Sequence, residues 1–191
     1  MFRALIAAVA LAVATLAAPA AMAQDTDRAS IAAQQTAMKR LSWMLGTWRG
    51  PGHGFNQSGP YQVTQTERIG SFLDGTLIVI EGKGFTPDGG VGFNAFGIIA
   101  YDTQTSSYRI HSYALGHSGD FALTPTDTGY VWEVPAGPNA VIRYTATLKD
   151  GVWTEVGDYA ATGQPPRRIF EMNLKRAGDT DWPMAGGMTR E

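Results

Sequence analysis

The chain has 191 residues, with 15 lysines and arginines against 17 aspartates and glutamates, and a formal net charge of −2. Charges of both signs are interspersed along it, so nothing indicates the basic surface that nucleic acids or anionic lipids require. It contains no cysteine, which excludes disulfides, thiolate catalysis and cysteine–zinc sites.

Residues 1–23 have the pattern of a secretory signal peptide. Arg3 supplies a short positive start, residues 5–18 carry no charge, and Ala21-Met22-Ala23 is a small-x-small cleavage sequence. The alternative is a membrane anchor, but the uncharged run is short for a helix that spans a bilayer. We therefore expect cleavage between Ala23 and Gln24, no stable membrane anchor, and a mature protein that is periplasmic or secreted.

The mature chain is expected to begin with a loose polar segment and then a helix. Ser30 can cap this helix, and Met38, Leu41 and Leu45 recur at helical spacing. Gly46 can end it, because glycine readily adopts the left-handed conformation that terminates helices.

From Trp48 onward the pattern changes to the period-two alternation of strands, with Gly, Pro, Asp and Asn at the turns. Ten strands are predicted, at residues 48–55, 62–69, 76–83, 93–101, 108–116, 120–124, 129–134, 140–148, 152–160 and 167–175. Short hairpins between them favour an antiparallel β-barrel with an N-terminal capping helix, because closure leaves no exposed edge. A flat sandwich is the alternative fold. Residues 24–176 are expected to form one domain, and residues 177–191 a flexible tail.

The segment at residues 41–52, LSWMLGTWRGPG, resembles the opening of nitrobindin-type calycins. It is more similar still to an uncharacterised family of small secreted bacterial proteins of the calycin type, which includes lipocalin-like and fatty-acid-binding-protein-like barrels. Segments 77–82, 97–102 and 170–176 are also similar to that family. The resemblance implies an all-β calycin-like barrel of ten strands in which Gly46 and Trp48 form the motif at the base. Barrels of this type usually hold a cavity.

In nitrobindins the resemblance would also imply haem, held by a histidine of the last strand. Aligning the end of the chain places Ile169 at that position, and isoleucine has no lone pair to give iron. We therefore expect no haem and no other cofactor. A metal ion is not expected either, because His111 and His117 would lie about 20 Å apart along a strand.

Polar and aromatic side chains within the predicted strands are the candidates for lining a ligand cavity. They are Glu67, Glu81, Arg109, His111, Tyr113, Arg143, Trp153, Glu155 and Glu171. If they face the interior, Arg109 and Arg143 are available to meet a carboxylate. Arg109-x-His111-x-Tyr113 would then place a cation, a titratable donor and a hydroxyl on one face. The alternative is that these side chains face solvent, because an antiparallel sheet has one wet face.

The expected function is to bind a small, partly apolar molecule in the barrel, and an acidic one if the arginines face inward. No catalytic residue is assigned. One alternative is an enzyme of isomerase or cyclase type that uses acid–base chemistry inside the barrel. Another is an envelope protein that binds a partner protein through its surface. Perturbed pKa values of buried glutamates or histidines would favour the enzyme.

Overall fold

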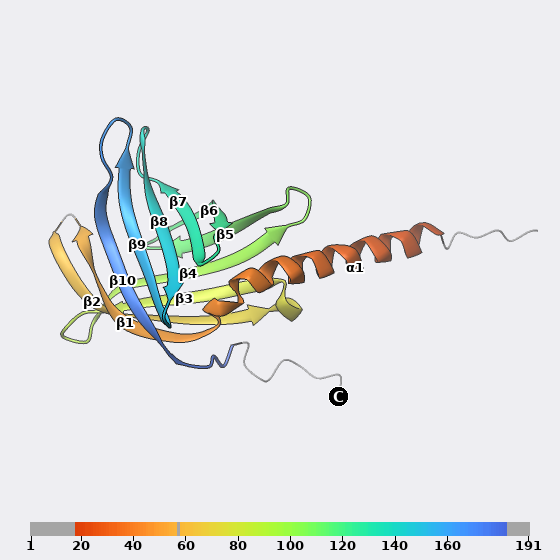
Figure 1. Cartoon of the computed structure of the whole chain (residues 1–191), viewed down its shortest axis with the longest axis horizontal. Helices are drawn as coiled ribbons and strands as arrows, with labels where there is room; N and C mark the ends of the chain where they lie inside the picture. The colour runs from red at the N-terminus through yellow and green to blue at the C-terminus, as the bar shows by residue number, and fades with distance from the viewer. Residues whose placement is uncertain (1–17, 57, 183–191) are drawn as a thin grey trace, which may run out of the picture.

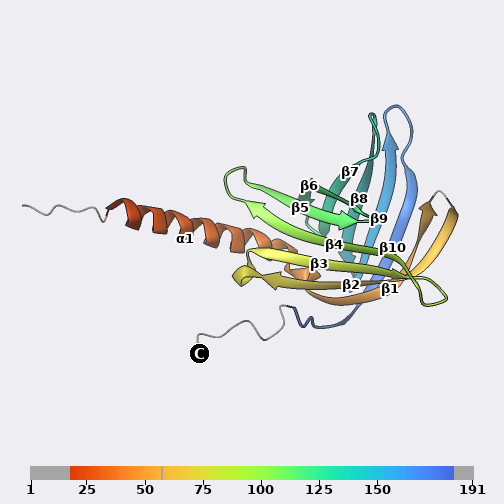
Figure 2. The ribbon, with the colours of Figure 1, turned by 180° about the vertical axis from the view of Figure 1, so that it is seen from behind.

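The computed structural model describes residues 18–56 and 58–182, so residues 1–17 of the predicted signal peptide lie outside the described residues. Ten antiparallel strands close into a barrel (Figures 1 and 2), which confirms the predicted fold class and excludes the flat sandwich. The strands are β1 (Gly46–Asn56), β2 (Gly59–Phe72), β3 (Leu77–Phe85), β4 (Val91–Asp102), β5 (Ser107–Ala114), β6 (His117–Pro125), β7 (Gly129–Pro135), β8 (Ala140–Lys149), β9 (Val152–Ala161) and β10 (Arg167–Gly178). Each strand pairs with its neighbour in sequence, and β1 pairs with β10 to close the barrel.

The helix α1 (Ala18–Met38) begins well before the predicted cap at Ser30, so the segment from Gln24 to Ala29 that was expected to be loose is helical. The α-helix ends at Met38, earlier than the expected end at Gly46, because a 3₁₀ segment follows it. Residues 18–23 are rich in alanine, the strongest helix former, and no glycine or later proline interrupts the segment that follows. The Ser30 hydroxyl instead forms a hydrogen bond with the Thr103 hydroxyl, 3.0 Å away. Figure 1 shows α1 reaching the barrel only with its C-terminal part and extending away from it at the other end. Among residues 18–56 and 58–182, no helix has the length and apolar character needed to cross a membrane.

A short 3₁₀ helix, η1 (Lys39–Met44), follows α1 and closes one end of the barrel, which we call the base. Leu41 and Met44 are fully buried there. Trp48 is 3% exposed, and its indole Nε1 donates a hydrogen bond of 2.8 Å to the carbonyl oxygen of Met44. Its ring also makes an edge contact with Trp153. Trp48 therefore fills the base, as the resemblance implied.

Gly46 begins β1 with φ at +124°, a conformation that side chains rarely adopt. A Cβ at this position would also lie 2.7 Å from the carbonyl oxygen of Gly178. The glycine of the motif is thus required where the helical segment turns into the first strand.

The chain continues past β10 along the outer wall of the barrel. Trp182 packs edge-on against Phe72 and Phe96, and the Arg68 guanidinium lies 3.9 Å from the centre of its ring. Gly70 makes room for it, because a Cβ there would lie 2.5 Å from the Trp182 Cβ. The part of the tail that precedes residue 183 is therefore packed against β2 and β4, and residues 183–191 lie outside the described residues.

Candidate functional site

Strand register decides which of the predicted cavity residues face the interior. Trp48 and Ile69 are buried at the base, so even-numbered residues of β1 and odd-numbered residues of β2 face inward. Following the pairs around the barrel places Glu67, Trp153 and Glu155 on the inner wall, and all three are at least nine-tenths buried. The other six predicted residues lie on the outer wall; they are Glu81, Arg109, His111, Tyr113, Arg143 and Glu171.

The segment Arg109-x-His111-x-Tyr113 therefore does not line a cavity. Its residues alternate with Ile110, which is buried in the core, so all three point outward. The His111 Nδ1 lies 2.9 Å from the Asp120 Oδ1, and the His111 ring packs on Tyr113. Arg109, His111 and Tyr113 share one face of the sheet, as predicted, but that face is the solvated one.

The other three outward residues form ion pairs with neighbours on the same wall. The Arg143 Nε lies 2.6 Å from the Glu133 Oε1, and the Arg168 Nη1 lies 2.9 Å from the Glu171 Oε2. Glu81 lies between Arg68 and Lys83. Because each charge already has a partner at the surface, none of them is available to a ligand inside the barrel.

Two glutamates are the central polar groups of the barrel interior. The Glu155 Oε2 accepts a hydrogen bond of 2.6 Å from the Tyr130 hydroxyl, and the Trp132 Nε1 lies 3.5 Å from its Oε1. The Glu67 Oε1 accepts a hydrogen bond of 2.8 Å from the Gln65 Nε2. Gln65, Tyr130 and Trp132 are site residues that the sequence did not single out.

The second oxygen of Glu67, Oε2, has no hydrogen-bond partner among the described residues, although the residue is buried and only 8% exposed. It lies over Gly82 on the neighbouring strand, where a Cβ would be 2.8 Å from the Glu67 Oε2. Gly82 thus leaves the space that this carboxyl group occupies.

Burial changes the protonation of the interior carboxyls. It raises the pKa of Glu67 to about 8, and the nearby charge of Glu155 acts in the same direction, while the hydrogen bond from Gln65 opposes both. Burial also raises the pKa of Glu155, against the hydrogen bonds from Tyr130 and Trp132. Burial lifts the pKa of Tyr130 well above its usual range, so its hydroxyl stays neutral. Glu67 therefore holds a proton at neutral pH.

The half of the barrel away from the base has an aromatic inner wall that is only partly covered. Phe121, Trp132, Tyr144 and Phe170 occupy inward positions, yet each keeps intermediate exposure. The Trp132 and Tyr144 rings stack with centroids 4.7 Å apart. Since these rings face into a closed barrel, their exposure indicates space inside it.

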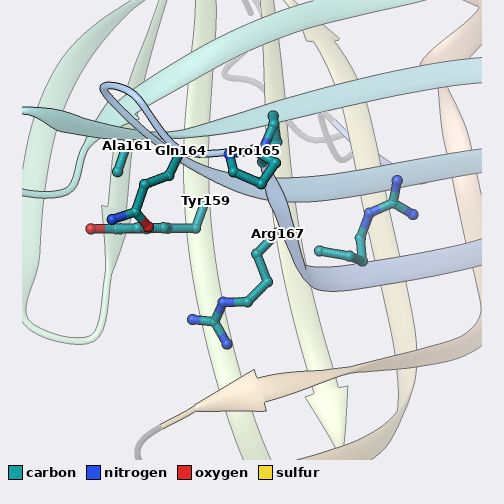
Figure 3. Close-up of a pocket in the computed structure, with 7 residues that line it drawn as sticks. Tyr159, Ala161, Gln164, Pro165 and Arg167 are labelled. Carbon is teal, nitrogen blue, oxygen red and sulfur yellow. The ribbon is translucent and has the colours of Figure 1, made fainter.

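A hollow of about 680 Å³ lies at the open end, beside the hairpin that joins β9 and β10, and its size is in the range of small-molecule sites. It is lined by Tyr159, Ala161, Gln164, Pro165, Pro166, Arg167 and Arg168. Figure 3 shows Gln164 alongside the Tyr159 ring and the Arg167 side chain extending away from the hairpin. No ion pair of Arg167 is found among the described residues.

No metal centre is evident in the part of the chain that the structure describes, because no three histidine, aspartate or glutamate side chains there are grouped closely enough. Ile169, where the haem ligand would be expected, falls at an irregularity in the pairing of β10 with β9.

Comparison with protein-family models found no match, and comparison with curated protein sequences found none either. Among solved structures, the crystal structure of Rv2717c from M. tuberculosis matches with a TM-score of 0.58 and 15% sequence identity. The match covers 73% of this chain and 96% of that one. At this identity the likeness establishes a shared barrel fold.

Proposed function

We propose that this chain is a calycin-like, periplasmic or secreted protein that binds a small, partly apolar molecule in the open half of its barrel. The observation that carries the proposal is the partly exposed aromatic wall around two buried carboxyls, inside a closed barrel. The location rests on the signal-like sequence of residues 1–23.

The acidic character expected of the ligand depended on Arg109 and Arg143. Both lie on the outer wall, so the proposal no longer includes it. The apolar character remains, because the inward side chains of the open half are mainly aromatic.

The test is titration with Nile red, a neutral apolar dye whose fluorescence rises when it leaves water. We expect saturable binding of one dye per protein. Ser112 faces inward between Gly97 and Gly119, so Ser112→Trp should fill the interior and abolish binding. Arg109→Trp adds the same bulk to the outer face of the same strand and should leave binding intact. Absence of saturable binding to the wild type, or equal loss in both variants, would contradict the proposal.

A second candidate function is acid–base catalysis, favoured by the proton that Glu67 holds at neutral pH and by its unpartnered Oε2. A suitable probe is 5-nitrobenzisoxazole, whose ring opens when a base removes the C3 proton as the N–O bond breaks. Base catalysis by Glu67 should rise with pH to a plateau above pH 8 and disappear in Glu67→Gln. Rates no greater than those of Glu67→Gln at any pH would remove this candidate.

A further inference from the structure

We propose that the ligand carries a positively charged amine, which lies between Glu67 and Glu155 while its apolar body packs on the aromatic wall. This inference rests on the proposed function and names the chemical class of the ligand. It follows from four features of the interior.

The first feature is a pair of acceptors without a cation. The Glu67 and Glu155 carboxyls are both at least nine-tenths buried. No lysine or arginine among the described residues forms a hydrogen bond or ion pair with either of them. On the outer wall, by contrast, Glu81, Glu133 and Glu171 all have basic partners. Buried carboxyls are normally paired with a cation or kept neutral by a proton, so a ligand cation that displaces the proton of Glu67 would supply a partner that no described lysine or arginine provides.

The second feature is the free oxygen of Glu67. Its Oε1 is held by Gln65, which fixes the carboxyl group, while its Oε2 has no partner among the described residues. An ammonium group has three donors and no acceptor. It can therefore contact this oxygen and keep donors for other acceptors of the interior, among which is the Glu155 carboxyl, whose charge acts on Glu67.

The third feature is the wall that separates the two glutamates. Two strands, β1 and β10, lie between β2 and β9. The inward positions of β1 in this stretch are Gly50 and Gly52, which carry no side chain. β1 therefore contributes only backbone there, and the inward side chain of this wall at the level of Glu155 is Met172 of β10, which is uncharged and pairs with both Gly52 and Glu155.

The fourth feature is the aromatic surface beside Glu155. The Trp132 ring stacks on Tyr144, and its indole nitrogen reaches toward Glu155. Aromatic faces attract cations and also pack against apolar groups. An amine attached to an apolar body matches both parts of the wall, because its donors meet the carboxyl oxygens and its body meets the rings.

Binding of an amine should displace the proton of Glu67. The titratable groups that act on Glu67 are Glu155 and Tyr130 inside the barrel and Glu81 on the outer face of β3. With the interior empty, burial raises the pKa of Glu67 to about 8. A cation at the Oε2 favours the ionised form, so the complex should form with release of about one proton at pH 7.

The experiment compares three ligands with the same apolar body by calorimetry at pH 7, in two buffers of different ionisation enthalpy. They are 4-phenylbutylamine, 4-phenylbutan-1-ol and 4-phenylbutyrate. We expect the amine to bind at least about tenfold more tightly than the other two, because its contacts are charge-assisted. Only the amine should release a proton.

Glu67→Gln keeps the shape of the side chain and should reduce the affinity for the amine to that for the alcohol, without proton release. Glu155→Gln provides a second variant and should also weaken the amine selectively. Glu171→Gln removes a carboxylate from the outer wall and should change neither the affinity for the amine nor the proton release.

Tighter binding of the alcohol or the carboxylate overturns the inference, as does an amine preference that survives both interior substitutions. If Nile red binds but the amine has no advantage, the inference fails and the proposed function stands. If neither the dye nor the amine binds, both fail.

Discussion

The buried Glu67 should make the protein less stable as the pH rises, and Glu67→Gln should remove this effect. In the unfolded chain this carboxyl titrates near its ordinary value of 4.5, whereas burial raises its pKa in the folded protein to about 8. Between these values the folded state keeps a proton that the unfolded state has lost. The free energy of unfolding therefore falls with increasing pH across this window.

The magnitude follows from the difference between the two pKa values. Each pKa unit corresponds to about 1.4 kcal/mol, so the effect grows to about 3 kcal/mol at pH 7 and about 5 kcal/mol above pH 8. Below pH 4.5 both states are protonated, and the effect vanishes. Glu67→Gln has no proton to lose. Its free energy of unfolding should therefore equal that of the wild type near pH 4.5 and exceed it at pH 9.

The assay is urea unfolding of both proteins at intervals from pH 4.5 to pH 9. Glu171→Gln is an informative control, because hydrogen bonds from Asn173 and Arg168 lower the pKa of Glu171. That substitution should lower the free energy of unfolding above pH 4.5, whereas Glu67→Gln should raise it. If the difference between Glu67→Gln and the wild type stays constant with pH, Glu67 is not a buried acid that holds its proton.

Four further predictions concern other parts of the chain. Trp48→Ala should lower the free energy of unfolding by about 3–5 kcal/mol, and an unchanged urea midpoint would show that the ring does not support the base. Trp182→Ala should lower it by about 1–2 kcal/mol through lost ring and cation contacts, measured in the same way. Haem mixed with the purified protein should give no sharp, stoichiometric Soret shift; tight one-to-one binding would contradict the reasoning from Ile169. N-terminal sequencing of the exported protein should begin at Gln24, and retention of Met1 would reject the signal peptide.

The strands could be predicted because their pattern is local. Alternation with a period of two and turn residues at the breaks identified all ten, with boundaries displaced by a few residues. The N-terminal end of α1 was missed, since the alanine-rich residues 18–23 were interpreted as signal sequence and not as helix.

The inner face could not be assigned from the sequence, because both faces of several strands carry polar and aromatic residues. In β5, Arg109, His111 and Tyr113 alternate with Tyr108 and Ile110, and nothing in this pattern alone says which set faces inward. The answer depends on pairing with other strands. Likewise, the hydrogen bond from Tyr130 to Glu155 joins residues of β7 and β9, which lie on either side of β8.

One local signal did mark the interior. Glycines at alternate positions of β1, including Gly50 and Gly52, indicate a face that has been left without side chains. The sequence alone favours a bulge or bend at this point. Register places Gly50 and Gly52 on the inward face, and a Cβ at Gly50 would meet the carbonyl oxygen of Asn173 on β10, so the close approach of the two strands requires this glycine.

The pairing of β1 with β10 means that the barrel is completed by the two ends of its own domain. Trp48 pairs with Arg176, whereas every other strand pair joins neighbours in sequence and can form as a hairpin. This last pairing requires ordering almost the whole domain, so closure is the slowest contact to organise. Until β10 is present, β1 and β9 each keep an unpaired edge that can join another chain. A chain whose last strand is still being made therefore remains open, and during that interval its two free edges are exposed to pairing with other chains.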